Sequence, residues 1–366
     1  MRYQQPIKQI LTGNRELWDH DDVRQAARDH FNKVVVCRTP VLGAERYASK
    51  TEEKLVYHTC KSPFCPSCGH NATELWQHEL QSVLPDIPYT GIVFTMPNVL
   101  RPIFQRNRHL LHDLPELGAQ VIQQRVKARY GVRVLIIVMP HTFGRHLDFK
   151  PHLHILVSGG GLKEGESRWI PRLQFNKRAL MHMWRYVVIT YLRHALQAMV
   201  LSSELAPDTL RGILKTQYER WWNIDIQHFM SKRQFLGYAG RYVRRPPIAQ
   251  HRFMRITDSE VVFWTNDLRQ KRRVETRYSM QEFITTLTHH VPDRCRHSMR
   301  YFGLLAPRSK GRILPAMFVL LGQQRPPRPR RLGWASLIRK HFGVDPLVDS
   351  AGQRMHWAGR LKPASL

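Results

Sequence analysis

The sequence lacks the long apolar runs that mark membrane-spanning segments and secretory leaders. Its longest apolar run is VLIIVMP, at residues 134–140, far shorter than the roughly 20 residues that cross a bilayer. The first residues, MRYQQPIKQILTGNRELWDHDD, contain no uninterrupted apolar core of a signal peptide. We therefore expect a soluble protein that stays in the cytoplasm and has no membrane partner.

Acidic residues are also scarce, and this shortage sets the charge of the chain. The 366 residues include 57 Lys and Arg against 28 Asp and Glu, a formal net charge of +29. Lysine and arginine bind polyanions by releasing counterions from phosphates, so a nucleic acid is the first partner to infer. Composition does not distinguish DNA from RNA, and a ribosomal or membrane-surface protein would be similarly basic.

Cysteine is sparse and unevenly distributed, which argues against a disulfide framework. Three of the five cysteines crowd into CKSPFCPSC, at residues 60–68. The spacing Cys60-x4-Cys65-x2-Cys68 resembles a zinc knuckle, in which a tight turn brings thiolates to one tetrahedral ion. The alternative is a set of buried or reactive thiols without a metal. Cys295 stands apart and is predicted to be a core thiol.

A tetrahedral zinc site needs a fourth ligand, and the sequence offers three candidates. They are Cys37, His58 and His70. We favour Cys37 because it begins the segment CRTPVLG, upstream of the cluster. The prediction is a structural Zn2+ site with the ligands Cys37, Cys60, Cys65 and Cys68.

Changes in composition divide the chain into three zones. Residues 1–85 form an N-terminal helical and zinc-binding region that ends at the proline-flanked linker LPDIP. Residues 86–306 carry the strong periodic signals and are predicted to be the main folded domain. Residues 307–366 form a basic extension, and its segment QQRPPRPRRLG is predicted to be extended because prolines and arginines resist packing.

Hydrophobic periodicity indicates both strands and helices. Strand-like runs lie at residues 90–96, 132–139, 152–157, 222–229 and 261–265. Helix-like stretches lie at 102–129, with a break at Pro115, and at 175–200, 208–221 and 231–244. Strands separated by long helices favour an α+β fold with helices on one or both faces of a sheet.

Two histidines interrupt the apolar run FKPHLHILVSGGG, at residues 149–161. Side chains of a strand alternate between its faces, so His152 and His154 share one face while Leu153 and Ile155 share the other. Taken alone, the pair is either a metal site or two partly exposed histidines on a polar sheet face. The second interpretation is the commoner one.

A second constellation, FLGYAGRYVRRPPIA at residues 235–249, changes that balance. It places Tyr238 and Tyr242 four residues apart, so that they share one face of a helix that two prolines end a turn later. Such a pair is usually a packing feature, but here it lies among positive charges and accompanies a histidine pair. The neighbouring residues predicted to bind DNA are Arg241, Arg244 and Arg245.

These residue types together suit phosphodiester chemistry. A phenol that attacks a phosphodiester must lose its proton, and a divalent ion held by imidazoles polarises the non-bridging oxygen and stabilises the developing charge. Two tyrosines allow two successive transesterifications. Each phosphotyrosine retains the energy of the broken bond, so strands can be rejoined without ATP, and no Walker-type glycine-rich loop is present.

Five segments together resemble the rolling-circle insertion-sequence transposases, which are HUH endonucleases with two tyrosines. The segments are IVFTMP (92–97), HTFGR (141–145), KPHLHILVSGGG (150–161), YAGRYVRRPPIA (238–249) and VPDRCRHSMRYFGLLAPRSKG (291–311). The resemblance covers roughly residues 30–320 in consistent order. It implies an antiparallel central sheet flanked by helices, with the histidines on a central strand and the tyrosine helix beside them, preceded by a cysteine-rich DNA-binding region.

The resemblance also implies roles for individual residues. His152 and His154 would bind Mg2+ or Mn2+, and Tyr238 and Tyr242 would be the nucleophiles. One tyrosine would cut at a transposon end and hold the 5′ phosphate, and the other would act on the second strand or at the target. The expected partners are single-stranded transposon ends and target DNA, and the expected location is the bacterial cytoplasm, at the nucleoid.

A third metal ligand is expected in such a site. Gln234 lies one helical turn before Tyr238, and relatives with a single tyrosine take a ligand from that helix. Asp148 and Asp225 are rivals. A surface glutamine is the commoner explanation of Gln234.

The chain departs from the family pattern in two places. Members often carry an extra Cys-x-x-Cys where this chain has GAERYASKTEEKL, and a second knuckle where it has VDSAG. We therefore expect fewer zinc ions in the N-terminal region than in a full member, and none in the tail.

Some features of the sequence also fit other functions. A plasmid replication initiator or a conjugative relaxase would use similar histidines and tyrosines, but usually without the cysteine-rich front. A zinc-containing DNA-binding regulator would share the charge and the cysteines but would not need the two tyrosines. A retroviral-type transposase with three carboxylates is disfavoured because acidic residues are scarce and form no convincing strand-anchored trio.

Overall fold

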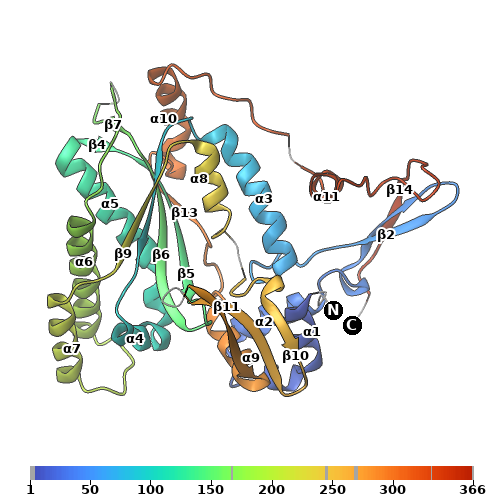
Figure 1. Cartoon of the computed structure of the whole chain (residues 1–366), viewed down its shortest axis with the longest axis horizontal. Coiled ribbons are helices and arrows are strands. Elements are labelled where there is room, and N and C mark those ends of the chain that lie inside the picture. The colour runs from blue at the N-terminus through green and yellow to red at the C-terminus, as the bar shows by residue number, and fades with distance from the viewer. Residues whose placement is uncertain (1–4, 166–167, 244–245, 268–270, 331, 365–366) are drawn as a thin grey trace. The chain divides into compact units, whose positions relative to one another are not determined.

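A computed structural model of the chain describes residues 5–165, 168–243, 246–267, 271–330 and 332–364 (Figure 1). Contacts divide the chain into two units, each assembled from separate stretches of sequence. Unit 1 contains Met1–His78, Arg244–Arg294 and Arg328–Leu366, and unit 2 contains Glu79–Val243 and Cys295–Pro327. This division differs from the linear order of three zones, because segments distant in sequence pack together within each unit.

Unit 2 is built on a five-stranded sheet, visible in Figure 1, whose strand order is β13-β5-β6-β3-β9. The strands are β3 (Tyr89–Phe94), β5 (Leu135–Phe143), β6 (Phe149–Ser158), β9 (Ile224–Phe229) and β13 (Arg300–Gly303). Every neighbouring pair is antiparallel. The expected antiparallel sheet is therefore confirmed, with the histidine strand β6 in its middle.

Helices cover one face of this sheet. They are α4 (Arg101–Arg106), α5 (Leu114–Tyr130), α6 (Lys177–Gln197) and α7 (Pro207–Glu219). The apolar side chains of β6, Leu153, Ile155 and Val157, are buried in one core with residues of these helices. Alternation along β6 thus turns His152 and His154 to the opposite face.

The opposite face carries the helix α8 (Lys232–Ala239). It packs on β3, where the rings of Phe235 and Tyr89 stack with centroids 4.1 Å apart. Unit 2 also contains α10 (Pro307–Leu320) and a small sheet of β4 (Val132–Arg133), β7 (Gly161–Lys163) and β8 (Trp169–Ile170).

Unit 1 contains two three-stranded sheets and several helices. Strands β1 (Ala44–Ala48) and β2 (Glu53–Tyr57) form a hairpin, and β14 (His356–Leu361) pairs antiparallel with β1. The second sheet consists of β10 (Phe253–Ile256), β11 (Glu260–Asp267) and β12 (Arg272–Ser279). The helices are α1 (Pro6–Gly13), α2 (Gln25–Val35), α9 (Met280–His290) and α11 (Trp334–Phe342), and α3 (Pro66–Val83) continues from unit 1 into unit 2. Short 3-10 helices lie at Arg15–Leu17, Pro40–Leu42 and Gln250–Arg252 in unit 1, and at Asn98–Leu100 and Arg108–His112 in unit 2.

One local expectation is corrected, and two others agree with the structure. The helical stretch predicted at 102–129 is broken just before Pro115, because α4 ends at Arg106 and α5 begins at Leu114. Pro115 lies in the first turn of α5, where its missing N–H costs nothing. The tyrosine helix ends at Ala239 rather than near residue 244. The segment QQRPPRPRRLG, predicted to be extended, has no helix or strand in its described residues 323–330 and 332–333, and it lies between α10 and α11.

Gly118 provides a test of how closely α5 packs on the sheet. A Cβ there would lie 2.6 Å from Leu153 Cδ1, whereas a Cβ at Gly212 in α7 would meet nothing within 4 Å. We expect Gly118→Ala to lower the free energy of unfolding by about 1–3 kcal/mol through overpacking. Gly212→Ala should raise it by about 0.5–1 kcal/mol, and urea denaturation measures both. Equal stability of the two variants would contradict this packing.

Candidate functional site

Three imidazoles meet on the face of the sheet opposite α5. His152 and His154 lie on β6, and His141 lies on β5, where the antiparallel register pairs it with His152. The Nε2 atoms of His152 and His154 are 3.1 Å apart. The His141 ring centroid lies 5.4 Å from that of His152 and 4.9 Å from that of His154. The three ring nitrogens form a group that could hold a metal ion.

Burial keeps these imidazoles neutral. It lowers the pKa of His141 to about 3 and the pKa of His152 to about 4, and it also lowers the pKa of His154. The proximity of the three rings adds to the shift for His141 and His154, because protonation of one ring disfavours protonation of its neighbour. Each ring therefore has a lone pair available at pH 7, which is the form that binds metals.

Backbone carbonyls hold two of the rings in place. The Nδ1 atom of His152 donates to the carbonyl of Lys150 at 2.7 Å, and the Nε2 atom of His141 donates to the carbonyl of Tyr242 at 2.7 Å. Among the described residues, His154 Nδ1 is buried and makes no hydrogen bond. Donation from one ring nitrogen leaves the lone pair on the other, as is usual for metal-binding histidines.

The spacing of the rings fits a divalent ion. Two neighbouring ligands of an octahedral ion with bonds of 2.0–2.1 Å lie about 3 Å apart. The 3.1 Å between the Nε2 atoms of His152 and His154 is close to that value.

Tyr242 lies beside the histidines, and Tyr238 lies beside Tyr242. The Tyr242 ring stacks on His154, with centroids 3.8 Å apart and planes 25° from parallel. The Tyr238 ring lies 4.8 Å from the Tyr242 ring, and the guanidinium of Arg241 lies 5.0 Å from the Tyr238 centroid. Two phenols and three imidazoles from distant parts of the chain therefore form one aromatic cluster.

Local sequence explains how Tyr242 reaches this position. Ser231 caps the start of α8, and glycines at 237 and 240 weaken its far end. Beyond Ala239 the chain tightens, with Tyr242 N–H bonded to the Ala239 carbonyl at 2.9 Å. In a 3-10-like turn the rise per residue along the helix axis is about 2.0 Å, compared with about 1.5 Å in an α-helix. The predicted proximity of the phenols holds although the uninterrupted helix does not.

Gly91 on β3 makes room for the second phenol. A Cβ at Gly91 would lie 3.1 Å from Tyr238 Cε1 and 3.2 Å from Phe229 Cε2. A glycine inside a strand often marks such a close approach. Tyr238 is buried in this position, with 6% of its surface exposed, and burial raises the pKa of its phenol, with further contributions from Tyr242 and Asp225.

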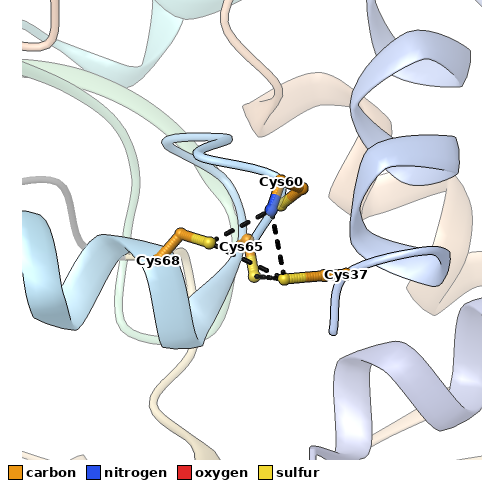
Figure 2. Close-up of side chains that lie close together, drawn as sticks. All are labelled: Cys37, Cys60, Cys65 and Cys68. Atoms are coloured by element: carbon orange, nitrogen blue, oxygen red, sulfur yellow. Dashed lines mark hydrogen bonds between the residues drawn. The ribbon is translucent and has the colours of Figure 1, made fainter. Parts of the chain in front are cut away.

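The cysteine cluster forms a second candidate metal centre, in unit 1 (Figure 2). Four sulfur atoms come together, from Cys37 after α2, Cys60 after β2, and Cys65 and Cys68 at the start of α3. The Cys37–Cys68, Cys60–Cys68 and Cys37–Cys65 sulfur separations are each 3.7 Å. A tetrahedral zinc ion with bonds of about 2.3 Å places its sulfurs about 3.8 Å apart, so the four thiols fit zinc.

Both candidate centres lie in regions that match models of known protein families. Residues 10–96 match the family model described as a transposase zinc-binding domain, and residues 136–312 match the one described as a putative transposase. The chain is 32% identical over 356 residues to the transposase for insertion sequence element IS801 of Pseudomonas savastanoi pv. phaseolicola, covering 93% of this chain and 86% of that protein. The chain belongs to the IS91 family of rolling-circle transposases.

A further relative supports this assignment. The transposase is 27% identical over 324 residues to the putative transposase y4qJ of Sinorhizobium fredii, covering 84% of this chain and 81% of that protein. No protein of solved structure matches it significantly. The resemblance inferred from the five sequence segments is confirmed.

Other residues singled out in the transposase sequence lie as follows. Gln234 is exposed, and its side-chain oxygen accepts from Met230 N–H at 3.2 Å. Asp148 pairs with Arg101 at 2.9 Å. Asp225 on β9 lies in the same row as His154 but two strands away, roughly 10 Å at the usual strand spacing.

The other residues that the sequence singles out are three arginines, His58 and Cys295. Arg241 is exposed, whereas Arg244 and Arg245 lie outside the described residues. The His58 ring contacts the Leu42 carbonyl and Glu45 rather than the sulfur cluster. Cys295 is exposed and not a core thiol, since it lies in a turn with φ of 61°. Among the described helices, none is long and apolar enough to span a bilayer.

His141 is the residue that sequence reasoning missed as a candidate ligand. It appeared only as the first residue of HTFGR. Its signal was present, because Met139 and His141 continue the alternation of a predicted strand. Only the antiparallel pairing of β5 with β6 shows that this alternation faces the histidine pair.

Proposed function

We propose that the transposase nicks and rejoins single-stranded DNA at transposon ends through covalent 5′-phosphotyrosine intermediates. The observation that supports this proposal is the convergence of Tyr238 and Tyr242 with His141, His152 and His154. Phenols stacked against neutral imidazoles suit phosphoryl transfer, because a nucleophile and metal ligands then share one phosphate. The high positive charge of the chain suits a DNA partner.

The imidazoles of His141, His152 and His154 would hold one Mg2+ or Mn2+ ion. Bound there, the ion would polarise a non-bridging oxygen of the scissile phosphate and stabilise the charge that develops on it. We prefer His141 to Gln234 as the third ligand, because its ring belongs to the cluster while the Gln234 side chain bonds the backbone at Met230.

In the proposed reaction, a tyrosine oxygen attacks the phosphorus and loses its proton to solvent. The bond from phosphorus to the 3′ oxygen breaks, and that oxygen leaves with the electron pair and takes up a proton. The 5′ phosphate stays esterified to the tyrosine. Attack of a 3′ hydroxyl on this ester reverses the step and rejoins a strand without an external energy source.

The two tyrosines have different surroundings, which supports different roles. Tyr242 stacks directly on His154 and is half-buried, so it is placed to act on the first phosphate at the ion. Tyr238 is buried against Gly91 and Phe229, and burial raises the pKa of its phenol. Tyr238 would act second, on the other strand or the target, after the first phosphotyrosine has left the histidines.

The four thiolates of Cys37, Cys60, Cys65 and Cys68 would bind a structural Zn2+ ion. The ion would join the segment after α2 to the start of α3 in unit 1, beside the buried rings of Phe31 and Phe64. Structural zinc sites of this kind contribute directly to folding.

The tyrosine assignment predicts loss of covalent chemistry without loss of DNA binding. Tyr242→Phe and Tyr238→Phe each remove one oxygen and little packing area, so each should strongly impair transposition. With a single-stranded end oligonucleotide and Mn2+, Tyr242→Phe should reduce the denaturation-resistant adduct by roughly 100-fold or more. Tyr186→Phe, an exposed tyrosine of α6, is the control. Full activity in either variant would make that tyrosine structural.

The ligand assignment predicts which substitutions change metal dependence. We expect His141→Ala and His154→Ala to raise the Mn2+ concentration needed for half-maximal cleavage by at least roughly 100-fold. Gln234→Ala should leave it near the wild-type value. Cleavage assays across a Mn2+ titration measure this, and the reverse pattern would make Gln234 the third ligand.

The zinc assignment predicts a metal-dependent fold in unit 1. Cys37→Ser should weaken the sulfur-to-metal charge-transfer band of the Co2+-substituted protein, because one of four thiolates is lost, and should lower the thermal stability. Cys295→Ser, which changes an exposed thiol, should change neither. A Cys37→Ser variant with an undiminished charge-transfer band would show that Cys37 is not a ligand.

A further inference from the structure

A third group of metal-binding side chains lies outside both centres described above. His70 and Glu74 come from α3, and His341 comes from α11, all within unit 1. One ligand atom from each lies within 4.8 Å of the other two. The rings of His70 and His341 have centroids 5.0 Å apart, and His341 Nε2 lies 3.6 Å from Glu74 Oε2.

The interval of four residues between His70 and Glu74 is typical of two metal ligands on one helix. His70 and Glu74 are four residues apart on α3, so they lie on one helix face. Two imidazoles and a carboxylate form a common three-ligand set for zinc, with bonds of about 2.0–2.2 Å. Ligands of a tetrahedral ion with such bonds lie roughly 3.4 Å apart, close to the 3.6 Å between His341 and Glu74.

We infer that His70, Glu74 and His341 form a second site for a zinc-like divalent cation, which ties α11 to α3. The site goes beyond the proposed strand-transfer chemistry and does not depend on it. The Glu74 side chain is only 17% exposed, whereas Lys340, which donates to the same carboxylate at 2.8 Å, is 53% exposed. The lysine can therefore withdraw into solvent when an ion binds, while the carboxylate and the two imidazoles stay together.

Weak anchoring of α11 gives such an ion a structural role. The helix has nine residues, and Leu337 is its only described residue that is buried. The Trp334 ring also approaches Tyr47 edge-on, with centroids 5.7 Å apart. Helices of this length are marginal without tertiary contacts. A metal bridge between α3 and α11 would hold the C-terminal segment to the N-terminal one, which is more than 260 residues away in sequence.

The first test counts metal ions in the full chain. After equilibration with zinc and removal of loosely bound ions, elemental analysis should find one equivalent less in Glu74→Gln and in His341→Ala than in the wild type. The thiolate charge-transfer band of the Co2+ forms should be unchanged in both. Glu79→Gln and His356→Ala, exposed residues of α3 and β14, are matched controls that should keep the wild-type content.

The second test follows α11 itself. Zinc should slow amide hydrogen exchange in residues 334–342 of the wild type by at least tenfold and have no such effect in Glu74→Gln. If Glu74→Gln and His341→Ala both kept the wild-type zinc content, the proposal would be overturned. The three residues would then form only an ionic cluster at the surface. The proposal would also be overturned if the ligand variants lost metal only from the thiolate site. It would be overturned as well if zinc did not change amide hydrogen exchange in α11 of the wild type.

Discussion

The antiparallel pairing of β5 with β6 is the constraint on which the candidate active site depends. Register opposes His141 to His152 and Met139 to His154, so that three imidazoles meet on one face. The opposite face of β6 is buried against α5 and α6 through Leu153, Ile155 and Val157. A slip of one residue would turn these apolar side chains outward and bury the histidines among the helices. The hydrophobic core thus holds the ligand set in position.

A hydrogen bond and a ring stack fix the tyrosine segment against the histidines. The Tyr242 carbonyl accepts the His141 N–H, while the Tyr242 ring covers His154. Gly91 lets Tyr238 approach β3 from the same face. Because these contacts bury the rings, the imidazoles stay neutral at pH 7 and the Tyr238 phenol stays protonated. The neutral imidazoles can therefore offer lone pairs to a cation, whereas the Tyr238 phenol keeps its proton in this arrangement.

Both units are assembled from segments that are far apart in the chain. The C-terminal strand β14 pairs with β1, and α11 contacts α3 through Lys340 and Glu74. The segment GAERYASKTEEKL forms most of the hairpin β1–β2, which β14 completes as a three-stranded sheet. Cross-strand pairing therefore joins the N-terminal and C-terminal segments of unit 1.

Sequence alone determined the elements whose signals are local. The alternation around His152 and His154, the Cys60–Cys68 spacing and the Tyr238–Tyr242 interval each follow from neighbouring residues, and so does the family to which the chain belongs. Tertiary structure decided what depends on pairing between distant segments: His141 beside the histidine pair, Cys37 among the other thiols, and His341 beside Glu74. It also decided that α8 ends before Tyr242, because a tightened turn and the bond to His141 outweigh helical periodicity. Periodicity reports which face of an element is apolar, whereas only strand register and helix packing bring two such faces together.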